Sequence, residues 1–135
     1  MKILKAVFNE MVAHAKQLAP VESCGYLAGK DGQATRFYPM TNVDNSPEHF
    51  SFDPKEQFKV LKEARNDGLT LLSVYHSHPE SPARLSEEDV RLLYDPAMVY
   101  IIVSLMGPKE DVKGYRIRKP DEKSVEIDRV NLELI

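Results

Sequence analysis

The fold of this chain is decided by the stretch LTLLSVYHSHPESPARLSEEDV, residues 69–90. Its first part is a short apolar run that is typical of a buried strand, and it leads into two histidines two positions apart, His76 and His78. A helix is predicted to begin after Ser86 and to stop before Pro96. The stretch therefore predicts a strand and a helix with a row of polar side chains where they join.

Helices and strands alternate on both sides of this stretch. Apolar residues recur at helical spacing from Phe8 to Leu18, and Asp53 followed by Pro54 predicts the start of a second helix. Strands are expected at residues 2–7, 25–29, 34–39, 98–105, 112–118 and 124–130. This order favours an α/β (α+β) fold, a single domain over residues 1–135 in which a mixed β-sheet is flanked by helices as a sandwich.

Two of these elements have an expected orientation. The second helix is expected to turn Phe58, Leu61 and Ala64 inward and to end near Gly68. The strand at 98–105, MVYIIVSL, is the most apolar of the chain, so we expect it near the centre of the sheet.

The composition excludes several classes of protein. The net charge is −3, so no basic excess attracts nucleic acid or anionic membranes, and neither is expected as a partner. No apolar run approaches the roughly 20 residues that a membrane span needs. Charged residues interrupt the N-terminal segment, so it lacks the continuous apolar core of a signal peptide. The single cysteine, Cys24, excludes a disulfide scaffold and a multi-cysteine zinc finger and suits a reducing compartment. A cytoplasmic location is therefore expected.

The two histidines are spaced to share a metal ion. Side chains two apart on a strand point the same way, with Cα atoms about 6–7 Å apart, so His76 and His78 can converge on one ion. Pro79 ends the strand and leaves both rings at its rim. Asp89, in the first turn of the following helix, is the nearest candidate for a third ligand. Two imidazoles and one carboxylate leave a fourth position open, as in a catalytic zinc site rather than a structural one.

Each of these residues also has a purely structural explanation. Ser86 and Asp89 have the spacing of a capping box, in which a serine and an acidic residue three positions later cap a helix. A solitary His-x-His is common on protein surfaces. Glu22, in PVESCGYLAG, is a candidate for the base that takes a proton from an attacking water, but its position alone favours an exposed loop glutamate. The place of the histidines, at the end of an apolar strand and just before a helix, favours the metal hypothesis.

Together these residues resemble the signature of a known family. Glu22, followed far downstream by H-x-H-P-x(6)-S-x(2)-D at residues 76–89, is similar to the signature of the JAMM (MPN+) zinc metallopeptidases, and every position of that signature is matched. The segments HAKQLAPVESCGYLAG and NVDNSPEHFSFDP are similar to the flanking segments of short bacterial and archaeal members. The resemblance spans at least residues 13–89. It implies a JAMM/MPN fold, which is similar to that of cytidine deaminase.

The resemblance also implies roles and a substrate. His76, His78 and Asp89 would bind Zn²⁺. Glu22 would take the proton of the attacking water and deliver it to the leaving amine, and Ser86 would donate a hydrogen bond to the oxyanion. Family members act as peptidases or isopeptidases after the C-terminal Gly-Gly of ubiquitin-like proteins, and short prokaryotic members act on sulfur carriers. A ubiquitin-like or sulfur-carrier protein with a Gly-Gly C-terminus is therefore the expected partner, its tail added to a sheet edge as a strand.

Three other functions compete with this interpretation. A zinc nucleobase deaminase would need H-x-E followed by P-C-x-x-C, and the chain has one cysteine. A cupin-like metal-binding barrel would need glycine-rich turns and a glutamate at a spacing that Glu80 does not have. A non-catalytic MPN scaffold that binds a ubiquitin-like protein is the remaining alternative. Such scaffolds have lost their ligands, whereas all five chemical positions are intact here.

Several residues near these motifs have simpler expected places. Cys24 is expected as a small buried residue, and Tyr75 is expected in the core or along the cleft. Asn42 and Asn45 are expected to form turns, and His49 is a candidate for lining the substrate groove.

Overall fold

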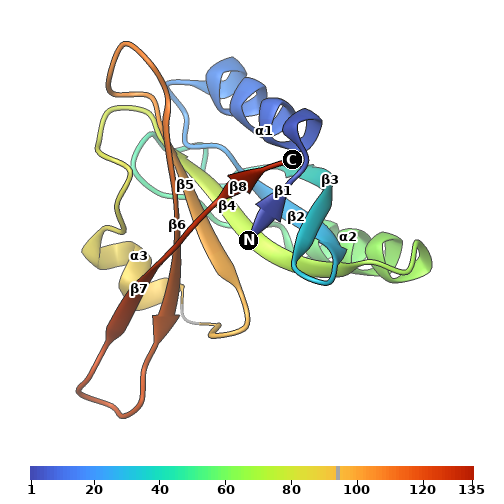
Figure 1. Ribbon diagram of the computed structural model, residues 1–135. Helices are drawn as coiled ribbons and strands as arrows, with labels where there is room; N and C mark the ends of the chain where they lie inside the picture. The colour runs from blue at the N-terminus through green and yellow to red at the C-terminus, as the bar shows by residue number, and fades with distance from the viewer. Residues whose placement is uncertain (94) are drawn as a thin grey trace.

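The computed structural model describes residues 1–93 and 95–135, and its strands form one eight-stranded mixed sheet (Figure 1). The strands are β1 (Lys2–Ile3), β2 (Cys24–Lys30), β3 (Gln33–Met40), β4 (Thr70–His78), β5 (Val99–Ser104), β6 (Asp111–Arg118), β7 (Glu126–Val130) and β8 (Glu133–Leu134). The helices are α1 (Lys5–Leu18), α2 (Pro54–Asn66) and α3 (Glu87–Leu92). The spatial order is β7-β6-β5-β4-β2-β3-β1-β8, with parallel pairs at β4–β5, β1–β3 and β1–β8. The predicted α+β fold with a mixed sheet is confirmed.

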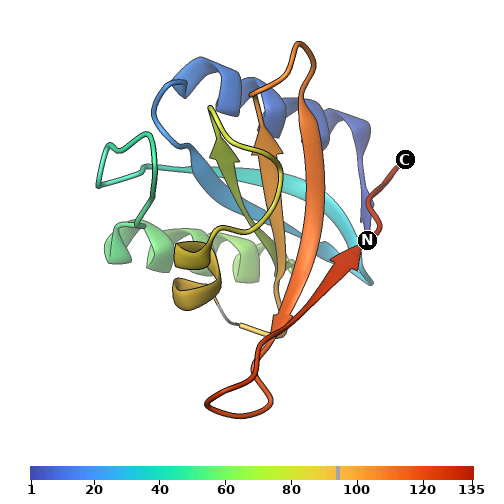
Figure 2. The ribbon, with the colours of Figure 1, turned by 90° about the vertical axis from the view of Figure 1, so that its left-hand side faces the viewer.

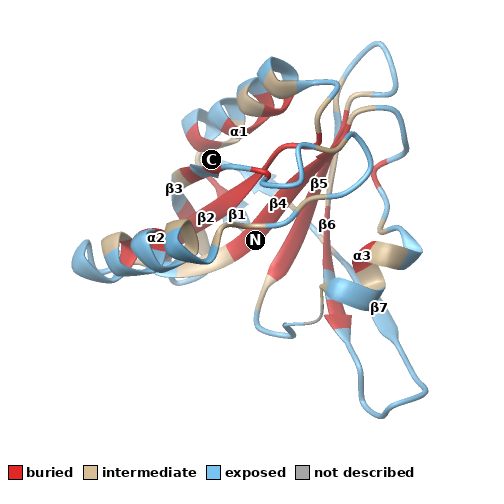
Figure 3. Ribbon diagram, turned by 180° about the vertical axis from the view of Figure 1, so that it is seen from behind, coloured by how far each residue is buried: buried red, intermediate tan, exposed pale blue. Residues whose placement is uncertain are grey.

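The sheet separates two layers of core, because successive side chains of a strand point to opposite faces. Along β4, Tyr75 packs in one layer with Met11 of α1, whereas Val74 packs in the other with Val60 of α2. Helix α1 covers the first face, and α2 and α3 lie over the second (Figure 2). Buried residues accordingly follow the central strands β2, β4 and β5, whereas β7 and the outer sides of the helices are exposed (Figure 3). His76, one residue after Tyr75, belongs to the face of α2 and α3.

Several local predictions are confirmed. The β2–β3 hairpin turns at Asp31 and Gly32, whose φ angles of 52° and 74° match the two-residue turns that join twisted strands. Asp53 caps α2 by accepting a hydrogen bond from the backbone N–H of Lys55. Every residue of β5 is buried, and the strand lies between β4 and β6. β6 and β7 pair as the expected antiparallel hairpin, with a loop at 119–125.

The first strand is shorter than predicted. A strand was expected over residues 2–7, but β1 ends at Ile3 and α1 begins at Lys5. Val7, Met11 and Ala15 are all buried at spacings of four, so the helical period begins before Phe8, and α1 starts three residues earlier than predicted. Among the described residues, no helix has the length and hydrophobicity to cross a membrane.

The predicted orientation of α2 is wrong for two residues. Phe58 and Leu61 were expected to face the core, but they are 67% and 43% exposed. The buried stripe of the helix is Val60 and Ala64, four residues apart. Gln57, one turn before, lies on the same side and its Nε2 donates to the Tyr26 hydroxyl at 3.0 Å. A narrow stripe therefore sits on the sheet and turns Phe58 and Leu61 toward solvent.

Candidate active site

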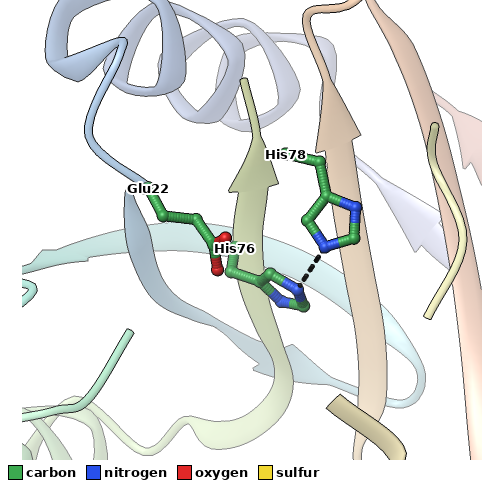
Figure 4. A group of neighbouring side chains, drawn as sticks. All are labelled: Glu22, His76 and His78. Carbon is green, nitrogen blue, oxygen red and sulfur yellow. Dashed lines mark hydrogen bonds between the residues drawn. The ribbon is translucent and has the colours of Figure 1, made fainter. Parts of the chain in front are cut away.

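The register between β2 and β4 brings Glu22 level with the histidines. Cys24 pairs with His76 in this antiparallel ladder, so Glu22, two residues earlier, comes opposite His78, two residues later. The backbone N–H of Ser77 donates to the Ser23 carbonyl at 2.9 Å, which continues the pairing beyond Cys24. Because each step is two residues, the three functional side chains point to the same face of the sheet (Figure 4). The structure thus joins positions that lie more than 50 residues apart in the sequence.

Three potential ligand atoms form a nearly equilateral triangle. His76 Nε2 lies 3.1 Å from His78 Nε2, and each lies 3.2 Å from Asp89 Oδ2. Two ligand atoms about 2.0–2.1 Å from one tetrahedral zinc ion would lie about 3.3 Å apart. The three predicted ligands are therefore brought together at a spacing that fits a zinc ion.

Glu22 lies beside this triangle. Its carboxylate is within 4.8 Å of the ligand nitrogens of both histidines, its residue is only 2% exposed, and its Oε1 has no hydrogen-bond partner in the described part of the chain. The alternative of an exposed loop glutamate is therefore wrong. Burial raises the pKa of Glu22 to about 8, with His78 lowering it and Asp89 raising it further. A buried carboxylate with a raised pKa beside metal ligands is suited to proton transfer.

Asp89 is both a helix cap and a neighbour of the histidines. Ser86 N donates to Asp89 Oδ2 at 3.0 Å, and Asp89 N donates to Ser86 Oγ at 3.0 Å, so the predicted capping box is present. Burial raises the pKa of Asp89, but hydrogen bonds to His76 and His78 lower it well below its usual range. The carboxylate thus stays ionised and faces both rings. Ser86 Oγ acts as an acceptor in the cap, which leaves its proton free to be donated.

The two histidines have different surroundings. His78 Nδ1 lies 2.8 Å from the Pro82 carbonyl, which can only accept, so Nδ1 carries the proton and Nε2 of the neutral ring presents a lone pair to the site. Burial lowers the pKa of His78, but hydrogen bonds to Asp89 and Pro82 leave it raised overall. His76 is completely buried, which lowers its pKa, and Phe50 stacks on its ring at 4.8 Å. Both rings are thus oriented by neighbours.

The loop between β3 and α2 is organised by Asn42. Its Nδ2 donates to the carbonyls of Glu22 and His49, each at 2.9 Å. Its Oδ1 accepts from the backbone N–H groups of Asp44 at 3.1 Å and Ser51 at 3.3 Å. Asn42 is 7% exposed, so its side-chain hydrogen bonds are largely shielded from solvent. One side chain therefore ties the loop to the residue that carries the candidate base.

Two cavities border the triangle, one at Asp89 and the other at His78. The larger, about 770 Å³, lies between residues 49–52 and α3 and is lined mainly by apolar side chains such as Phe52 and Met98, with His49 also on its wall. The smaller, about 280 Å³, contains Glu22, His78 and Ser86. The larger volume is in the range of ordinary ligand sites, about 300–1,000 Å³. The candidate site is thus bordered by a mainly apolar cavity and by a smaller, mainly polar one.

The sequence matches the family of prokaryotic homologs of the JAB domain over residues 4–118. The chain belongs to this family. The match covers β2, β4 and α3, and so includes every residue of the site just described.

Named relatives of this JAB domain include peptidases. The CysO-cysteine peptidase of Mycobacterium tuberculosis is 38% identical over 112 residues, which cover 81% of this chain and 77% of the relative. The probable TtuB-protein conjugate cleaving protease of Thermus thermophilus is 38% identical over 88 residues, 64% of this chain and 59% of the relative. A protein from Desulfitobacterium hafniense, solved in solution, is 42% identical with a TM-score of 0.87 and covers 99% of this chain and 92% of its own.

The likeness of fold extends further than the likeness of sequence. A JAB1/MPN domain protein from Archaeoglobus fulgidus has a TM-score of 0.60 at 22% identity, over 100% of this chain and 97% of its own. At that identity the comparison concerns the fold alone, and it agrees with the JAMM/MPN sandwich implied by the signature.

Some site residues of this JAB domain were not foreseen from its sequence. Phe50, stacked on His76, and Pro82, whose carbonyl orients His78, lie in loops without a periodic pattern. Asn42 was expected only as a turn former, and the one available signal was the density of turn-forming residues at 41–54. His49 lines the larger cavity, as expected of a groove residue, and Cys24 and Tyr75 are buried as expected.

Proposed function

We propose that this chain is a zinc-dependent peptidase or isopeptidase that hydrolyses the bond after the C-terminal Gly-Gly of a ubiquitin-like or sulfur-carrier protein. The observation that carries the proposal is the triangle of His76 Nε2, His78 Nε2 and Asp89 Oδ2, with the buried Glu22 carboxylate beside it. The substrate class is supported by relatives named for CysO-cysteine cleavage and TtuB-conjugate cleavage.

Each residue has a defined task in this proposal. Bound by His76, His78 and Asp89, a zinc ion would supply Lewis acidity to the attacking water and the scissile carbonyl. Glu22 takes a proton from the water as its oxygen attacks, then delivers a proton to the leaving nitrogen as the C–N bond breaks. Ser86 donates its hydroxyl proton to the oxyanion, a contribution of about 3–4 kcal/mol. Glu22 is therefore regenerated in its ionised form at the end of each cycle.

The substrate tail is proposed to lie in the larger cavity rather than at a sheet edge. The edge strands are β7 and β8, and neither carries a residue of the site, so the expected addition of a strand at an edge does not place a bond near Glu22. The 770 Å³ cavity instead reaches Asp89 and has aromatic and aliphatic walls, including Tyr26 and Leu93. Two glycines give a tail that is narrow enough to approach the triangle closely.

A cleavage assay tests the proposal. The zinc-loaded protein is incubated with each Gly-Gly-ended small protein of its own genome, carrying a C-terminal extension, and mass spectrometry reads the cut site. We expect release of the extension with a carrier that ends at Gly-Gly. Zinc-loaded protein that cuts none of these carriers, or cuts them elsewhere, would overturn the proposal.

A further inference from the structure

The smaller cavity at the site has an acidic rim. It is lined on one side by Glu48, from the loop that Asn42 organises, and on the other by Glu80 and Ser81, just beyond the end of β4. Both glutamates are exposed, and no lysine or arginine lines the cavity or pairs with either of them in the described residues. At its base lies Glu22, with its buried and unpartnered Oε1. Two exposed carboxylates thus flank a cavity that also contains a buried carboxylate oxygen with no partner among the described residues.

The proposed role of Glu22 assigns the leaving amine to this cavity. A group that delivers a proton has to come within hydrogen-bond reach of the atom that receives it. Glu22 lines the smaller cavity and does not line the larger one. Given the proposed function, Glu22 and Ser86 place the scissile bond at the smaller cavity, so the amine side continues into it, while the Gly-Gly tail runs back into the apolar cavity.

The rim remains negative when the metal is counted. The two charges of a bound divalent ion would be balanced by the carboxylates of Asp89 and Glu22, which lie at the triangle and beside it. Glu48 and Glu80 are then two further negative charges around the amine. Charges at the rim of a binding site act mainly on partner selection and association rate.

We propose that Glu48 and Glu80 make this cavity a leaving-group pocket that accepts the side-chain amine of a lysine and rejects an amine that carries its own α-carboxylate. A lysine joined through Nε brings a flexible alkyl chain with no negative charge. It leaves as a neutral amine after receiving the proton from Glu22, and a second proton from water converts it to an ammonium ion that the rim attracts. A free amino acid joined through its α-nitrogen instead holds a carboxylate two bonds from the scissile nitrogen, inside the acidic rim. The inference rests on the proposed function and assigns an isopeptide bond as its preferred substrate, which sets this chain apart from the relative named as a CysO-cysteine peptidase.

Three substrates with one carrier tail test this selection. The Gly-Gly end is joined to the Nε of a lysine within a peptide, to the α-nitrogen of cysteine, or to the α-nitrogen of cysteinamide. The last two differ in the carboxylate alone, so the ratio of their kcat/KM values measures the effect of that charge. We expect the wild type to cleave the cysteinamide and lysine substrates about tenfold faster than the cysteine substrate at low salt.

Charge variants then connect the ratio to the rim. In the double variant E48Q/E80Q, the cysteinamide-to-cysteine ratio should fall toward one, and in E80K it should fall below the wild-type value. Raising the salt to about 1 M should shrink the wild-type ratio, because exposed charges are screened over about 3 Å there. The control variant E87Q, at an exposed glutamate of α3 outside both cavities, should keep the wild-type ratio.

The outcomes separate this inference from the function on which it rests. Equal cleavage of the cysteine and cysteinamide substrates by the wild type, or a ratio that E48Q/E80Q leaves unchanged, would overturn the leaving-group pocket and leave the peptidase intact. Failure to cleave any of the three substrates would overturn the proposed function itself.

Discussion

Glu22 combines properties that a glutamate between a helix and a strand ordinarily lacks. It is buried, one of its oxygens has no partner among the described residues, and burial raises its pKa to about 8. Burying a carboxylate without a partner costs free energy, so the residue is poorly explained as part of the scaffold alone. A cation held by its neighbours His76, His78 and Asp89 would lower the pKa of Glu22 and so favour its ionised form.

Replacing Glu22 by glutamine separates metal binding from catalysis. Glutamine keeps the shape of the side chain but cannot accept a proton, so Glu22→Gln should retain one equivalent of zinc while kcat falls about 10²–10⁴-fold. Zinc content by mass spectrometry and kcat on a Gly-Gly substrate measure the two effects. Glu87→Gln, on the exposed side of α3, should keep both zinc and kcat. A Glu22→Gln variant that is fully active would refute the role of the base.

At the scale of elements, local patterns were predicted and long-range placement was not. The strand–histidine–cap sequence of β4 and α3 is encoded within 22 residues, so its strand, its capping box and its convergent histidines followed from spacing. The burial of Glu22 depends on the register of β2 against β4, which no local pattern sets, and only the family resemblance pointed to it. The rotation of α2 was missed because helical spacing marks a stripe without saying which of two neighbouring stripes meets the sheet.

The loop held by Asn42 offers a prediction at this scale. Asn42→Ala removes the donors to the Glu22 and His49 carbonyls and the acceptor for two backbone N–H groups. Each buried group left unpaired costs about 1–3 kcal/mol, so the melting temperature should fall. Because the loop also walls the larger cavity and anchors Glu22, kcat should fall at least tenfold, assayed well below the melting temperature, with zinc content unchanged.

A matched variant in the same loop controls for general damage. Asn45 is exposed and has a positive φ of 47°, which glycine adopts readily. Asn45→Gly should therefore keep the wild-type kcat and stability. If Asn42→Ala loses stability and kcat no more than Asn45→Gly does, Asn42 does not position the site.

At the scale of the whole molecule, the site connects three separate parts of the chain. Glu22 precedes β2, His76 and His78 lie at the end of β4, and Asp89 lies in the first turn of α3. A metal that binds the folded chain and not the unfolded one stabilises the fold in proportion to its concentration over its dissociation constant. Without metal, the same cluster places a poorly compensated carboxylate in the interior.

The stability of the metal-free protein should therefore depend on pH through Glu22. The pKa of Glu22 is about 8 in the fold against a usual value of 4.5, so between these values the folded state binds more protons than the unfolded state. The free energy of unfolding should then fall as pH rises from about 4.5 to 8. Metal-free Glu22→Gln should be more stable than metal-free wild type at pH 8, by up to a few kcal/mol at about 1.4 kcal/mol per unit, and the gap should close toward pH 5.

Urea denaturation in the presence of a chelator measures this difference. Glu87→Gln serves as the control, because its exposed carboxylate should leave the pH dependence of unfolding unchanged. Parallel pH curves for wild type and Glu22→Gln would show that Glu22 carries no such penalty.

The central claim is that two imidazoles and one carboxylate hold one zinc ion beside Glu22. X-ray absorption at the zinc K-edge, on protein loaded with one equivalent, tests it most directly. The predicted spectrum has two imidazole nitrogens and an oxygen from Asp89, all about 2.0–2.1 Å from zinc, with no sulfur. A zinc–sulfur distance of about 2.3 Å, or a shell of oxygens without imidazole, would contradict the claim.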